Sequence, residues 1–142
     1  MHAADAARRR ERRLRGQGAA RHDTAQNEGV DAATIHTVDA FAYLLKRLKE
    51  TPEGDGNLLD NSCLLLGSDA ASGYTHAVFD QPCIVAGKGG GALKHPGIHY
   101  RSPSQENTSD ILLACLRTVV PDAAQVGSDI GLSTTPCAPI LA

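Results

Sequence analysis

Two short apolar stretches decide the fold of this chain: Cys63-Leu64-Leu65-Leu66, and then Pro82-Cys83-Ile84-Val85-Ala86. Neither stretch alternates between apolar and polar residues. Runs that are apolar on both faces are typical of interior strands of a parallel sheet, which helices cover on each side. The pattern therefore predicts two buried strands, joined by the polar loop 68–81.

A helix is predicted on each side of these strands. Over residues 31–50 apolar side chains recur at steps of three and four, and Asp31 is a suitable N-cap. Residues 108–119 repeat this spacing, with a cap among residues 107–109. The order helix, strand, loop, strand, helix predicts an α/β fold with a partial, mainly parallel sheet flanked by helices.

The remaining segments of the body are predicted to be turns. Residues 53–57 and 87–91 are glycine-rich, and the second stretch is not a phosphate-binding loop, because Gly-Lys-Ser/Thr does not follow four spacer residues. Residues 95–102 are expected to form a short hairpin or an edge strand.

Charge divides the chain into an arm and a body. Residues 1–21 carry a net charge of +5 and residues 22–142 a net charge of −7. Six arginines crowd into positions 8–15, and no apolar periodicity follows them. We therefore expect three parts: a disordered basic arm over 1–29, an α/β portion of a larger domain over 30–121, and a surface tail over 122–142.

The arginine cluster raises the possibility of a nucleic-acid partner, and a membrane partner is judged from the apolar residues. Nucleic acid is not expected, because no aromatic or base-reading group accompanies the arginines. The sequence contains no run of about 18 apolar residues, so a membrane span is not expected. The cluster also lacks the following apolar run of a secretory signal, so no export signal is predicted in the chain as written.

Four cysteines occur, at positions 63, 83, 115 and 137, and none of them has zinc-knuckle spacing. Three lie inside apolar runs, so we expect buried free thiols that act as small hydrophobic groups. A disulfide between two of them is the alternative if the protein is exported, and the spacing does not select the pair.

Several linked motifs resemble the bacterial domain-of-unknown-function family fifteen-fifty-two, a group of exported proteins. The resemblance covers about residues 22–135 and rests on these stretches: Phe41-Ala42-Tyr43-Leu44-Leu45, Thr51-Pro52-Glu53-Gly54-Asp55-Gly56, Leu58-Leu59-Asp60-Asn61-Ser62, Gly67-Ser68, His76, Pro82, Ala86-Gly87-Lys88-Gly89-Gly90-Gly91 and His99-Tyr100-Arg101. This family looks like a remote branch of the alkaline-phosphatase and sulfatase-like superfamily.

The resemblance implies that this chain corresponds to the C-terminal portion of a longer, exported or periplasmic protein. Ser68-Asp69-Ala70-Ala71 matches a Ser/Thr-Asp-His-Gly motif, with Ala70 in place of the metal-binding histidine. A second histidine that relatives carry near His76 corresponds to Val78 here. The superfamily nucleophile and several of its metal ligands are implied to lie outside this chain.

Two pairs of residues are candidate sites. Asp69 and His76 offer the oxygen and nitrogen ligands that a divalent metal takes, although a closed site needs three or four ligands. His99 and Arg101 together could bind an anion. The alternative is that Asp69 caps a turn and His76 is a solvent-exposed histidine.

These observations predict at most a remnant of a metal-dependent phosphate or sulfate ester hydrolase. No catalytic residue is assigned, because the serines lack the Gly-x-Ser-x-Gly context of a nucleophile elbow. We expect the chain to be inactive alone, with a divalent metal held by the longer parent protein. The alternative function is a non-catalytic exported binding or structural module, which the replacements at Ala70 and Val78 favour.

Overall fold

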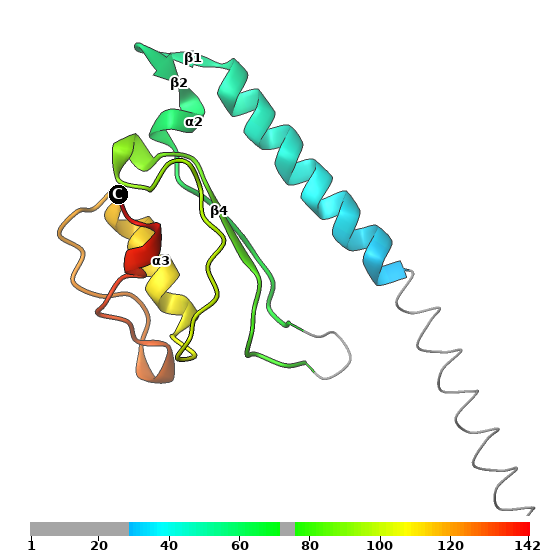
Figure 1. Ribbon diagram of the computed structural model, residues 1–142, viewed down its shortest axis with the longest axis vertical. Helices are drawn as coiled ribbons and strands as arrows, with labels where there is room; N and C mark the ends of the chain where they lie inside the picture. Colours follow the sequence, from blue (N-terminus) through cyan, green and yellow to red (C-terminus); the bar gives the residue numbers. More distant parts are fainter. Residues whose placement is uncertain (1–28, 72–75) are drawn as a thin grey trace, which may run out of the picture. The chain divides into compact units, whose positions relative to one another are not determined.

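A computed structural model of the chain describes residues 29–71 and 76–142 (Figure 1). It divides into two compact units, Met1–Tyr43 and Leu44–Ala142. The predicted basic arm lies outside the described residues, except for Gly29, which is helical.

Residues 29–50 are helical throughout. The Thr34 hydroxyl donates a hydrogen bond of 2.8 Å to the carbonyl of Val30, four residues earlier. Asp31 therefore lies inside the helix, and its prediction as the N-cap is wrong, because a cap residue has a non-helical backbone. No helix in the described ranges is long and apolar enough to cross a membrane.

A small antiparallel hairpin follows this helix. Strands β1 (Pro52–Glu53) and β2 (Gly56–Asn57) pair around the predicted glycine-rich turn. Helix α2 (Leu58–Asn61), which the sequence pattern did not predict, begins directly after β2. Asn57 is its N-cap, because the Asn57 side chain accepts a hydrogen bond from the backbone N–H of Asp60.

The two predicted strands are present as β3 (Leu64–Gly67) and β4 (Cys83–Ala86), but they pair antiparallel. The prediction of a mainly parallel sheet is therefore wrong, although the chain does combine helices with strands. A parallel pair needs a long crossover, usually a helix. Here Ala71 N–H bonds the carbonyl of Ala77 at 2.8 Å, and the described residues of the 68–82 connection contain no helix.

Helix α3 (Thr108–Arg117) matches the second predicted helix, and Asn107 is its N-cap. Its Leu113 and Ala114 are fully buried. The other buried apolar residues in the described part are Leu93 and Cys137. The core is therefore small and lies against α3.

Two segments flank α3 in the sequence. Residues 95–102 form no strand. Residues 122–142, predicted as a surface tail, contain the one-turn helices η2 (Asp129–Gly131) and η3 (Ala138–Ile140) and take part in two bridges. Leu141 pairs with Leu93, and Val126 with Ser133, which is 3% exposed. Burying apolar side chains of this segment adds to a core that α3 could not form alone.

Candidate functional site

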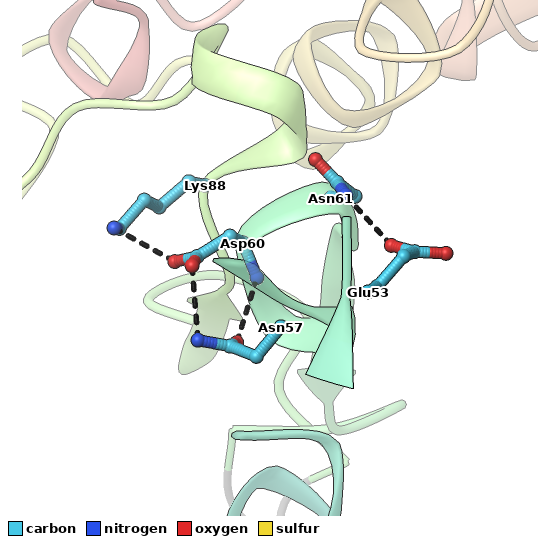
Figure 2. Close-up of polar contacts among 5 residues, drawn as sticks. All are labelled: Glu53, Asn57, Asp60, Asn61 and Lys88. Atoms are coloured by element: carbon cyan, nitrogen blue, oxygen red, sulfur yellow. Dashed lines mark hydrogen bonds and ion pairs between the residues drawn. The ribbon is translucent and has the colours of Figure 1, made fainter. Parts of the chain in front are cut away.

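A cluster of polar side chains surrounds α2 (Figure 2). Asp60 Oδ1 lies 2.7 Å from Lys88 Nζ, and Asp60 Oδ2 accepts a hydrogen bond of 2.9 Å from Asn57 Nδ2. The hydrogen bond from Lys88 holds the pKa of Asp60 below its ordinary value. Nearby, Asn61 Nδ2 donates to Glu53 Oε2 at 2.6 Å. These contacts join the β1–β2 hairpin, α2 and the segment after β4.

Backbone hydrogen bonds also join α2 to the segment after β4. Lys88 N–H donates to the carbonyl of Leu59 at 3.3 Å, and Gly89 N–H donates to that of Ser62 at 2.9 Å. Gly87 has a φ of +99°, and a Cβ on it would lie 2.0 Å from the Ser62 carbonyl oxygen. Only glycine fits this approach. The stretch Gly87–Gly91 therefore has an architectural role, in which η1 (Gly89–Gly91) is fixed against α2.

The candidate metal ligands lie at the opposite end of the β3–β4 pair. Asp69 and His76 are both exposed, and His76 has a φ of 50°. The Asp69 carbonyl accepts a hydrogen bond of 2.8 Å from Gln81 Nε2, and Ser68 Oγ donates to the carbonyl of Ala70 at 2.7 Å. These bonds hold the backbone of the loop and leave the Asp69 carboxylate at the surface.

No metal centre is formed by the described residues alone, since they contain no group of three or more His, Cys, Asp or Glu side chains that could hold an ion. Metal binding by Asp69 and His76 would need further ligands from outside this part of the chain. It stays a prediction.

A groove of about 870 Å³ lies between the end of the 76–81 segment and the N-terminal end of α3. Its lining combines exposed apolar side chains with polar ones: Val78, Phe79, Asp80, Gln81, Cys83, His99, Tyr100, Arg101, Ser102, Gln105, Glu106, Asn107, Thr108, Asp110, Ile111, Ile130 and Cys137. A smaller cavity of about 150 Å³ lies between β4 and α3.

The polar side chains of the groove bond to one another. Arg101 Nη2 lies 3.1 Å from Asp80 Oδ2, so the predicted anion-binding arginine already has a carboxylate partner. His99 lines the same groove. The Tyr100 hydroxyl donates to Glu106 Oε2 at 2.8 Å, and this bond raises the pKa of Tyr100. The structure thus brings His99 and Arg101 to one groove, and anion binding there stays a prediction.

All four cysteines are free thiols, and Cys115 lies in α3. Burial raises the pKa of Cys83 and of Cys137. Burial and then a hydrogen bond to Cys63 raise the pKa of Cys115 to about 12. Cys137 alone is classed as buried, while the other three are half-buried, so the expectation of buried thiols holds only in part.

Comparison with protein-family models, with curated proteins and with solved structures finds no match to this chain. The resemblance noted from the motifs is therefore neither supported nor opposed by these comparisons.

Sequence reasoning missed the Asn57–Asp60–Lys88 link and the groove. The link had a signal, because Asn57 and Asp60 have the spacing of an N-cap and the third helical residue, which marks a helix start. The groove had none, since it depends on bringing residues 78–83, 99–110 and 130–137 together.

Proposed function

We propose that this chain is a non-catalytic part of a larger protein related to the alkaline-phosphatase and sulfatase-like superfamily, in which β3 and β4 belong to a wider sheet. The observation that carries this proposal is the small size and apolar character of the β3–β4 pair. It is two-stranded among the described residues, and both of its faces are apolar. An isolated two-stranded pair is marginal in water and gains stability from further strands or a covering helix.

The register assigns the side chains to the two faces. Leu66 is opposite Ile84, and Leu65 is opposite Val85, so these pairs point to opposite sides of the sheet. Ile84 is 43% exposed and Leu65 is 37% exposed. Apolar side chains left in water on both faces are what a strand pair from the interior of a larger sheet would show.

The absence of catalysis is supported by the groups at the candidate site. Asp69 and His76 are exposed, and no third ligand joins them among the described residues. In the groove, Arg101 is already paired with Asp80. Neither set offers a nucleophile beside a base, which covalent ester hydrolysis needs.

An assay of the purified chain tests the inactivity. With p-nitrophenyl phosphate or p-nitrophenyl sulfate and added Zn²⁺, Mg²⁺ or Ca²⁺, the hydrolysis rate should equal that of the buffer with metal. Asp69→Ala is the matched control and should give the same rate. Turnover by the chain that Asp69→Ala abolishes would contradict the proposal.

Hydrogen exchange tests the wider sheet. In the isolated chain at monomeric concentration, the amides of β3 and β4 that point away from the partner strand should exchange far faster than those between the strands. Slow exchange along both outer edges would show that the pair is already complete and would end the proposal.

The second candidate function is a non-catalytic binding module, which the groove favours. Val78, Phe79 and Ile130 line it and are 71%, 67% and 99% exposed. The dye 8-anilinonaphthalene sulfonate, which binds exposed apolar surface, should fluoresce with the chain and lose this signal in Phe79→Asp. The control is Val120→Asp, at an exposed position that is not part of the groove lining. Equal loss in both variants would count against a groove site.

A further inference from the structure

The helix over residues 29–50 carries an apolar stripe along one face. Its members recur at alternating steps of three and four: Ile35, Val38, Ala42 and Leu45. Alternating steps of this kind keep side chains on one side of a helix, and they are the spacing with which two helices pair. Ile35 and Val38 are 62% and 41% exposed, so apolar surface of the stripe is in contact with water.

One charged residue of each sign ends this stripe. Asp31 lies four positions before its first member and Lys49 four positions after its last, and both are exposed. Eighteen residues separate them, which is about five full turns, so the two charges lie on the face of the stripe. Neither has an ion-pair partner within residues 29–71 and 76–142, whereas Lys46 and Arg47 each pair with Glu50 in the same helix.

The four apolar positions and the two charged ones form a symmetric seam. Its steps are four, three, four, three and four, which read the same in both directions along the helix. An antiparallel copy of the helix therefore matches every seam position with another: Asp31 with Lys49, Ile35 with Leu45, and Val38 with Ala42. Each match occurs twice, as the two-fold axis of a homodimer requires.

The charges select the antiparallel direction. In a parallel pair, Asp31 would face Asp31 of the second copy, and Lys49 would face Lys49. Like charges opposite one another disfavour that arrangement, and the antiparallel arrangement replaces both repulsions with attractions. Charge complementarity of the helix with itself therefore indicates a second copy of this chain as the occupant of the seam.

We propose that the helix over residues 29–50 pairs antiparallel with the same helix of a second copy, in the register that matches Asp31 with Lys49. Burial of the apolar stripe supplies the affinity. The two end pairs set direction and register, because exposed ion pairs contribute little affinity. The seam extends over about 27 Å of helix, which makes a small interface, so the dimer is weak and dissociates on dilution.

Sedimentation equilibrium of the full chain tests the pairing. The average mass should rise from the 14.9 kDa of one chain toward twice that value as the concentration increases. A range of about 10 µM to about 1 mM suits so small an interface. Val38→Asp, which places a charge within the stripe, should remain monomeric throughout.

Ala40→Asp is the matched control for Val38→Asp. Ala40 is exposed and lies about half a turn from Val38, on the opposite face of the same helix. This variant should associate as the unmodified chain does, with equal helix content in both variants by circular dichroism. A chain that is monomeric at every concentration would leave the seam to some other partner and overturn the proposal, as would a dimer that persists in Val38→Asp.

Charge exchange at the ends of the seam tests the direction. Asp31→Lys and Lys49→Glu should each raise the dissociation constant about tenfold, because each turns two attractions into two repulsions. An equimolar mixture of the two variants should recover the affinity of the unmodified chain, since opposite charges meet again at both ends. If each variant alone associates as tightly as the unmodified chain, and the mixture more tightly, the helices are parallel and the proposal is overturned.

Discussion

The two ends of the β3–β4 pair differ in how they are held. At the end where β3 begins and β4 finishes, Lys88 bonds both the Asp60 side chain and the Leu59 carbonyl, and Gly89 is fixed to Ser62. At the other end, Asp69 and His76 are exposed. The motif residues Lys88 and Gly89 therefore hold the fold together through their hydrogen bonds. The candidate metal ligands Asp69 and His76 lie at the end with exposed side chains.

The largest effect should come from Gly87→Ala. The added Cβ would meet the Ser62 carbonyl at 2.0 Å, with φ at +99°. We expect a loss of about 4 kcal/mol or more in the free energy of unfolding, measured with urea. Gly90→Ala is the control, since its φ of +66° is strained but nothing lies within 4 Å, and it should cost about 1 kcal/mol. Equal effects would show that the close approach is absent.

Leu113→Ala tests the core on which the constrained end rests. Leu113 is fully buried, and its truncation should lower the free energy of unfolding by about 3 kcal/mol. Leu112→Ala, one position away and 40% exposed, should cost less than about 1 kcal/mol. If the two variants unfolded at the same urea concentration, α3 would not be the centre of the core.

The Asp60–Lys88 contact should affect stability mainly in acid. Its hydrogen bond keeps the folded-state pKa of Asp60 below 3.8, the ordinary value. A lowered folded-state pKa contributes stability above pH 3.8, and this contribution is lost as the pH falls through the folded-state value. Asp60→Asn should therefore flatten the decline of melting temperature below pH 3.8.

Lys88→Met should have the same effect on the acid decline, because it removes the main cause of the pKa shift. Asp55→Asn, at an exposed carboxylate in the β1–β2 turn, is the control and should leave the decline unchanged. A decline that stays the same in Asp60→Asn would show that the contact contributes nothing to folding.

The smallest effects belong to the loop end. Asp69→Ala and His76→Asn should each change the free energy of unfolding by less than about 0.5 kcal/mol, because both side chains are exposed. Asparagine suits the φ of 50° at position 76. Metal content by mass spectrometry should equal that of the unmodified chain. A clear loss of stability in either variant would mean that the loop end is constrained as well.

The sequence predicted the local elements better than their arrangement. Periodicity located α3, and the two apolar runs located β3 and β4. The pairing direction was not in the pattern, because a run that is apolar on both faces is compatible with either direction when no crossover helix is found. The packing of Leu141 and Cys137 was hidden in a segment whose Gly, Ser and Pro content indicated a tail.

For the candidate site, the sequence indicated which residue types could bind a ligand, but not which side chains contact one another. His99 and Arg101 line one groove, and the partner of Arg101 is Asp80, more than twenty residues away in sequence. The hydrogen bond from Gly89 N–H to the Ser62 carbonyl likewise joins two segments that are distant in sequence. Spacing along a chain does not encode such meetings unless a local motif repeats them.

Ile130 lies in the loop between Val126 and Ser133, which pair as an antiparallel bridge, and it is a suitable position for a label. Its side chain is 99% exposed and lies at the groove, while its carbonyl accepts a hydrogen bond of 2.8 Å from Asn107 Nδ2. A change of side chain there leaves that backbone anchor in place. A fluorescent amino acid introduced by stop-codon suppression at position 130 would therefore serve as a reporter, whose emission shifts when any molecule settles beside α3.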